Sequence, residues 1–218
     1  MVVALPGCGS SDPSIQAKSP VEVVASSQQV AEHYTSVLAS GLVQDTGNLY
    51  IRVDLHIVPG KGAVGYITYR RNDHEVYPID IVLLGNAIYL KAHQDFYERI
   101  GDGKAARYLA EKWTRSSVDS KSMFRTLAAY TELPNLTQGF FGQHGKLSMG
   151  AMTGVVGMKV VEVKNDATDE VLYVAASGKP YPIQILKGGA VSNDGIAFDH
   201  WNQPMVIIPP SKAIDLES

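Results

Sequence analysis

A strict two-residue alternation over residues 49–57 is the feature that most constrains the fold. In Leu-Tyr-Ile-Arg-Val-Asp-Leu-His-Ile the odd positions are apolar and the even positions are polar or amphipathic. This period is typical of a β-strand with one buried and one solvated face. Turn signals at 60–62, 71–73 and 85–86 then separate strands expected at 64–71, 75–84 and 87–92. The sequence therefore predicts an antiparallel meander and not βαβ units.

Helical patterns and a second set of strands surround this meander. Apolar residues at three- and four-residue spacing predict a helix that begins near Ser26 and ends at Gly41. Short helices are expected at 94–100, 104–112, 120–130 and 133–141, and period two returns at 158–163, 170–176, 181–187 and 195–201. The proline-bounded segment 204–208 suits a final edge strand. This order predicts an α+β fold in which a single large curved antiparallel sheet carries helices across its concave, open side.

Composition limits the functional classes. A chain of 218 residues, 45% of them hydrophobic, is long enough for one domain with a sizeable core. The net charge of −3 gives no electrostatic footprint for nucleic acid. No apolar run reaches the roughly 20 residues that span a bilayer. Any membrane attachment would therefore be covalent or peripheral.

No residue pattern predicts catalysis, a metal or a cofactor. Ser148 lies in Lys-Leu-Ser-Met-Gly, which lacks the first glycine of a nucleophile elbow. The six histidines include no His-Glu-x-x-His or comparable ligand spacing. His56 and His74 could meet across neighbouring strands, but two histidines without a third ligand are weak evidence for a metal. We therefore predict that the protein is not an enzyme.

The only cysteine, Cys8, lies in a segment that resembles the lipobox of bacterial lipoproteins. Leu5 stands three residues before it and Gly7 one residue before it, although Pro6 is unusual between them and no basic segment precedes. The resemblance implies that residues 1–8 hold a residual signal segment and that Cys8 is the lipidation site. Residues 9–25 are polar and lack an apolar period, which predicts a flexible tether. The protein would then be lipid-anchored at the outer face of the cell membrane.

The chain from residue 26 to 216 resembles the actinobacterial lipoproteins related to LppX, LprA, LprF and LprG. The matching segments are Thr-Gly-Val-Val-Gly at 153–157, Leu-Tyr-Val-Ala at 172–175, Gly-Lys-Pro-Tyr-Pro-Ile at 178–183 and Phe-Asp-His-Trp-Asn-Gln-Pro at 198–204. The resemblance implies a U-shaped half-barrel, similar to the periplasmic lipoprotein carrier of Gram-negative bacteria, over residues 26–218. It also implies that lipid or glycolipid acyl chains are held in an apolar cavity and carried between envelope sites, with an envelope lipid transporter as a partner.

A lipid cavity needs a concave apolar surface and a few polar groups. The same side chains would also fill an ordinary core, so the alternative is a non-transport surface lipoprotein that binds a protein or polymer partner. Eight basic against five acidic residues between Lys91 and Arg125 suggest a mildly basic helical cap for anionic headgroups, although ordinary solvated helix faces have the same pattern. The expected cavity lining is Leu49, Ile51, Val53, Leu55, Ile79, Ile81, Leu83, Ile88, Leu90, Phe124, Leu127, Leu136, Phe140, Phe141, Val161, Val163, Leu172, Val174, Ile183 and Ile185.

Overall fold

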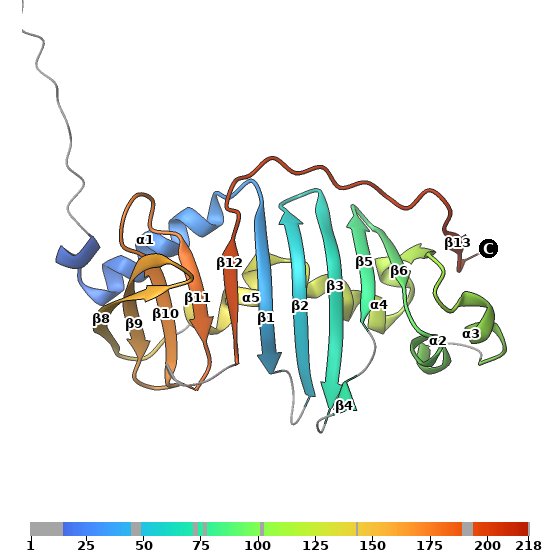
Figure 1. The fold of residues 1–218 in the computed structure, drawn as a ribbon, viewed down its shortest axis with the longest axis horizontal. Helices are drawn as coiled ribbons and strands as arrows, with labels where there is room; N and C mark the ends of the chain where they lie inside the picture. The colour runs from blue at the N-terminus through green and yellow to red at the C-terminus, as the bar shows by residue number, and fades with distance from the viewer. Residues whose placement is uncertain are drawn as a thin grey trace, which may run out of the picture.

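The computed structural model describes residues 15–44, 49–71, 74–75, 78–100, 103–142, 144–188 and 194–217. These residues form one open sheet of 13 strands with helices on one face (Figure 1). The strands lie in the order β13 (Ile214–Asp215), β7 (Thr114–Ser117), β6 (Ala87–Lys91), β5 (Ile79–Leu84), β3 (Gly62–Arg71), β2 (Leu49–Val58), β1 (Val37–Gln44), β12 (Gly195–Asp199), β11 (Pro182–Leu186), β10 (Glu170–Ala175), β9 (Met158–Asn165) and β8 (Leu147–Val155), while β4 (His74–Glu75) pairs with β3.

The helices lie between the two sets of strands in the sequence, apart from the first. Helices α1 (Pro20–Glu32), α4 (Ser122–Ala129) and α5 (Leu133–Phe141) lie behind the sheet in the view of Figure 1. Helices α2 (Gln94–Ile100) and α3 (Gly103–Leu109) lie at the end of the molecule beyond β6, and two short 3₁₀ helices occupy Ile15–Ala17 and Val118–Ser120. The expected α+β fold with helices on one side of a single sheet is confirmed. Strand β13 pairs in parallel with β7, so the sheet is mixed and not wholly antiparallel.

The core lies between the sheet and these helices. Ile51, Val53 and Leu55 of β2 are buried in one continuous cluster that also contains Phe124 of α4 and Phe140 of α5. The alternation that predicted β2 therefore assigns its buried face correctly. No helix in the described ranges is long and apolar enough to cross a membrane.

The first helix begins and ends earlier than expected. We expected it over 26–41, after a tether that ends at residue 25, but α1 spans Pro20–Glu32 and β1 follows at Val37–Gln44. The Ser19 side chain accepts a hydrogen bond from the Glu22 backbone, the Glu22 carboxylate accepts one from the Ser19 backbone, and Pro20 occupies the first turn. Gly41, expected to end the helix, lies in β1, where a β-carbon would collide with the backbone of Gly195 in β12.

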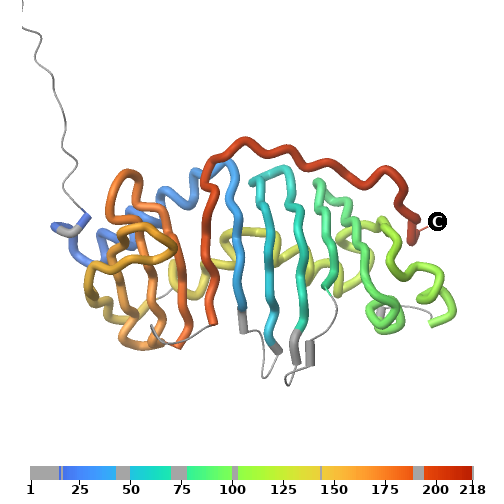
Figure 2. Tube along the Cα trace, in the orientation of Figure 1, coloured from blue at the N-terminus to red at the C-terminus, as the bar shows by residue number. Residues whose placement is uncertain are grey.

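The C-terminal segment is not the edge strand that we expected at 204–208. After β12 the chain runs without strand pairing along one end of the sheet and reaches β13 on the far side (Figures 1 and 2). Pro204, Pro209 and Pro210 lack the backbone N–H that a ladder requires. Pairing resumes only at Ile214, whose backbone N–H donates to the carbonyl oxygen of Trp113 at 2.9 Å.

Candidate functional site: a groove between the sheet and helices α1 and α5

Most of the side chains expected to line a cavity share the helix-covered face of the sheet. The side chains that belong to, or pack against, the main cluster are Ile51, Val53, Leu55, Ile79, Ile81, Leu83, Ile88, Leu90, Phe124, Leu127, Leu136, Phe140, Phe141, Val161, Val163, Leu172, Val174 and Ile185. Leu49 is the first residue of β2, and its side chain lies outside the described part of the chain, as does the whole of Cys8.

Ile183 is the exception, because it lies on the other face of the sheet. Tyr173 pairs with Gln184, whereas the next residue, Val174, pairs with Pro182, so a bulge leaves Ile183 without a partner position. A bulge reverses the alternation of faces along its strand. Ile183 therefore packs in a second, smaller cluster with Val160, Val171, Tyr173 and Leu186.

A groove of about 820 Å³ opens where the helices meet one end of the sheet. Its walls come from four segments that are distant in the sequence: the end of α1, the β2–β3 turn, the β5–β6 turn and the segment from Thr131 through α5. The volume falls within the range of ligand pockets, roughly 300–1,000 Å³. Of the expected lining residues, Leu83 and Phe141 border this groove. The other sixteen that belong to or contact the main cluster do not border it.

The deep part of the groove is apolar. Ala31, Ile57, Leu83 and Leu133 are buried members of the main cluster that also border the groove. The polar side chains among them are satisfied locally: the Thr131 hydroxyl donates to the Ala128 carbonyl at 2.7 Å, and the Thr137 hydroxyl donates to the Leu133 carbonyl at 3.1 Å. These hydroxyl groups leave no buried donor to be paired by a ligand, so the wall suits hydrocarbon.

The rim of the groove is polar, and its side chains are largely hydrogen-bonded to one another. The Gln28 side chain donates to the Glu32 carboxylate at 2.9 Å, and the Asn135 side chain donates to the Glu132 carboxylate at 3.2 Å. Lys61, in the β2–β3 turn, is the only cation among the described residues that border the groove. None of the bordering residues falls between Lys91 and Arg125, so the basic helical block that we considered as a headgroup site contributes nothing to this groove.

Tyr34 connects the groove to the end of the sheet. It borders the groove and packs edge-on against Trp201, with ring centroids 6.0 Å apart. Burial raises the pKa of Tyr34 to about 12 and the nearby Glu132 carboxylate acts in the same direction, while a hydrogen bond with the Leu133 backbone opposes both. The phenol is therefore neutral at physiological pH and adds no charge to the groove.

A second, smaller hollow of about 220 Å³ lies on the opposite face of the sheet, at the same end of β2. It is bordered by His56 and His200, whose ring centroids are 6.3 Å apart, and by Pro204 and Met205. His74, which we considered as a partner of His56, has its side chain outside the described part of the chain. No group of three potential metal ligands among histidine, cysteine, aspartate and glutamate occurs in the described ranges.

Comparison with known proteins supports the fold through structure alone. No protein-family model matches the sequence, and a search of curated proteins finds no relative. LprF from Mycobacterium bovis superposes with a TM-score of 0.59 at 15% identity, covering 88% of this chain and 97% of that one. The Mycobacterium tuberculosis lipoprotein LppX gives a TM-score of 0.50 at 13% identity, covering 87% and 98%. The expected likeness to the LppX and LprF fold is thereby confirmed.

Proposed function

We propose that this protein is a cell-envelope lipoprotein that binds the acyl chains of a lipid or glycolipid in the groove and carries them between envelope sites. The observation that supports this most directly is the groove itself, which has apolar deep walls and a polar rim at one end of an LppX-like fold. In this proposal the tether expected at residues 9–25 is shortened to the polar residues between Cys8 and α1. Cys8 carries the lipid anchor, and the protein faces outward from the cell membrane of an actinobacterium.

The chemistry of the groove fits a lipid with one polar end. Hydrocarbon gains about 0.8 kcal/mol for each buried methylene, so the apolar floor formed by Ala31, Ile57 and Leu133 favours an acyl chain. A headgroup would remain at the rim, near Lys61 and the carboxylates of Glu32 and Glu132. This mixed charge favours a zwitterionic or sugar headgroup over a strongly anionic one. We assign no catalytic step and no cofactor, and an envelope lipid transporter remains the proposed partner.

Leu83→Trp tests this site. Leu83 borders the groove, whereas its neighbour Leu84 points to the opposite face of β5, so Leu84→Trp is a matched control. We expect Leu83→Trp to weaken binding of cis-parinaric acid roughly tenfold or more, or about 1.4 kcal/mol, and Leu84→Trp to leave it unchanged. Fluorescence titration measures the affinity, and circular dichroism verifies the fold.

Ala31→Phe provides a second obstruction from the opposite wall of the groove, on α1. Unaltered affinity in folded Leu83→Trp and Ala31→Phe variants would show that the acyl chain binds elsewhere. An equal loss in the Leu84→Trp control would show that the effect is a general disturbance of β5.

A further inference from the structure

The C-terminal segment Gln203–Pro210, here called the strap, presents two aliphatic side chains to solvent. Val206 is 80% exposed and Ile208 is 74% exposed, which are the largest exposed fractions among the described large apolar residues. Met205 and Ile207, which alternate with them, are half-buried. Outward positions of an extended segment are ordinarily polar, so two adjacent aliphatic positions of this kind point to a contact with another apolar phase.

The composition of the strap favours a lipid surface over a partner strand. Residues 203–210 contain no charged side chain, and the next cation along the chain is Lys212. Pro204, Pro209 and Pro210 have no backbone N–H, so an added strand would lose three of its ladder donors within eight residues. A bilayer needs no such ladder, because it takes up side chains alone at its interface.

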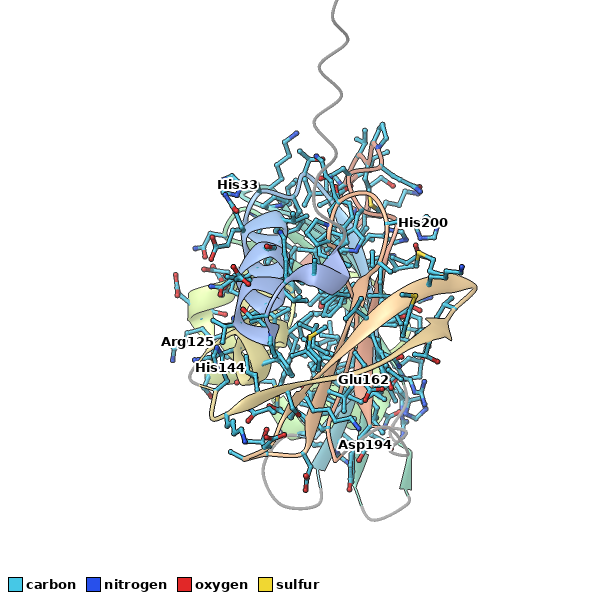
Figure 3. All side chains as sticks on the ribbon, turned by 90° about the vertical axis from the view of Figure 1, so that its left-hand side faces the viewer. His33, Arg125, His144, Glu162, Asp194 and His200 are labelled. Carbon is cyan, nitrogen blue, oxygen red and sulfur yellow. The ribbon has the colours of Figure 1, made fainter. Side chains whose placement is uncertain are left out.

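The strap and the mouth of the groove lie at the same end of the molecule. His56 borders the small hollow beside Pro204 and Met205 of the strap, while the next residue of β2, Ile57, borders the groove on the other face. Figure 3 shows this arrangement: His33, which follows the last turn of α1 at the groove, and His200, which precedes the strap, lie near one end on opposite sides of the sheet.

We propose that the strap is a membrane-docking surface, on which Val206 and Ile208 enter the interface of a lipid bilayer and hold the groove mouth close to it. The proposal rests on the function proposed above, because a groove that exchanges lipid must open toward a lipid phase. The docking is shallow, since two side chains and no helix or strand enter the interface. It depends on apolar contact and not on charge, so it varies little with ionic strength.

Vesicle flotation of the full chain tests the proposal. Cys8→Ser removes the proposed acyl anchor, and the vesicles contain phosphatidylcholine and phosphatidylglycerol in equal parts. We expect the Cys8→Ser protein to float with the vesicles in both low and high salt, and Val206→Ser/Ile208→Ser to reduce the bound fraction roughly tenfold.

The matched control removes two exposed aliphatic side chains elsewhere. Val156, at the β8–β9 turn, is 72% exposed, and Val21 on α1 is 58% exposed. Val156 has a φ of 49°, a turn position that asparagine favours, and Val21 is exposed on α1, so we expect Val21→Ser/Val156→Asn to preserve the fold. We expect this control to float like the parent chain.

Three results would overturn the docking proposal. They are no flotation of the Cys8→Ser protein, an equal loss of the bound fraction in the Val21→Ser/Val156→Asn control, and flotation that high salt abolishes. The parinaric acid titration is carried out on the same samples. Normal parinaric acid binding without flotation would contradict the strap alone, whereas flotation without parinaric acid binding would contradict the function proposed for the groove.

Discussion

Asn202 joins the end of β12 to the segment that precedes β1. Its side-chain oxygen accepts hydrogen bonds from the Thr35 backbone N–H at 2.6 Å and from the Thr35 hydroxyl at 3.0 Å, and its amide donates to the Tyr181 hydroxyl at 2.6 Å. Its φ of 59° lies in the left-handed region, which asparagine tolerates better than most residues. The Asn202 side chain therefore makes three hydrogen bonds, while its backbone adopts the left-handed conformation of the turn.

Asn202→Ala should destabilise the protein by about 2–4 kcal/mol, because it removes these hydrogen bonds and because alanine tolerates the left-handed conformation less well than asparagine. Urea unfolding measures the change. Asn202→Gly removes the same bonds without the steric penalty, so it should be less destabilising by about 1 kcal/mol. Equal destabilisation by alanine and glycine would show that the backbone conformation contributes nothing.

Tyr34 makes stability depend on pH at the alkaline end. Its pKa is raised to about 12, primarily by burial, whereas an unfolded tyrosine ionises near pH 10. The unfolded chain loses the proton first, so the contribution of Tyr34 is fully present below about pH 10 and is lost as pH rises toward 12. Burial also raises the pKa of Tyr97 and Tyr173, which add to the same trend.

Tyr34→Phe should therefore make the loss of stability between pH 10 and about 12 less steep. Chemical unfolding at several pH values gives the slope. Tyr108→Phe removes a phenol that is 62% exposed and is the control. A slope that is identical in the Tyr34→Phe variant and the unmodified chain would contradict the assignment of this titration to Tyr34.

At the scale of elements, the start of α1 depends on one local motif. The Ser19 hydroxyl donates to the Glu22 carboxylate at 2.7 Å, and the Ser19 backbone N–H donates to it at 2.8 Å. Ser19→Ala should lower stability by about 1 kcal/mol, as loss of an N-cap typically does. Thermal unfolding compares it with Gln29→Ala, an exposed change within the same helix that should have little effect. If Ser19→Ala unfolds at the same temperature as Gln29→Ala, the motif does not set the helix start.

Sequence patterns predict an element well where burial and period agree. The alternation in 49–57 predicts both β2 and its buried face, because Ile51, Val53 and Leu55 follow a strict period of two. The prediction of a helix over residues 30–41 is wrong for most of the segment, because its apolar residues fit the period of a helix as well as that of a strand. Its helical part ends at Glu32, and the rest is β1, held between β2 and β12 by pairing that is distant in the sequence.

The position of the groove could not be predicted from the sequence pattern for a related reason. Its walls meet only because the topology brings the end of α1, two strand turns and α5 together. The pattern of apolar residues identifies which side chains face the helices but not which of them pack tightly, so it included Leu55 and Phe124 along with Leu83 and Phe141. Ile183 shows a second limit, since a bulge reverses its face without a distinct sequence signal beyond the neighbouring Pro182.

At the scale of the whole molecule, the open sheet and its helices give two different faces. The helix-covered face holds the main core and, at one end, the groove of about 820 Å³, while the other face has the smaller cluster formed by residues of β9, β10 and β11. The strap runs along the end of the sheet at which β2 finishes (Figure 1), and the β2–β3 turn at that end borders the groove. In our proposal the protein therefore has a single working end, where lipid enters and leaves and where the chain meets the membrane.

Lipid carriage is tested by native mass spectrometry of the full chain, with Cys8 replaced by serine and produced in an actinobacterial host. We expect a discrete added mass that organic solvent releases, and we expect Leu83→Trp to reduce the fraction of protein that carries this mass while Leu84→Trp does not. A bare polypeptide mass, unchanged after incubation with added glycolipid, would contradict lipid carriage and would favour a surface module that binds a protein or polymer partner.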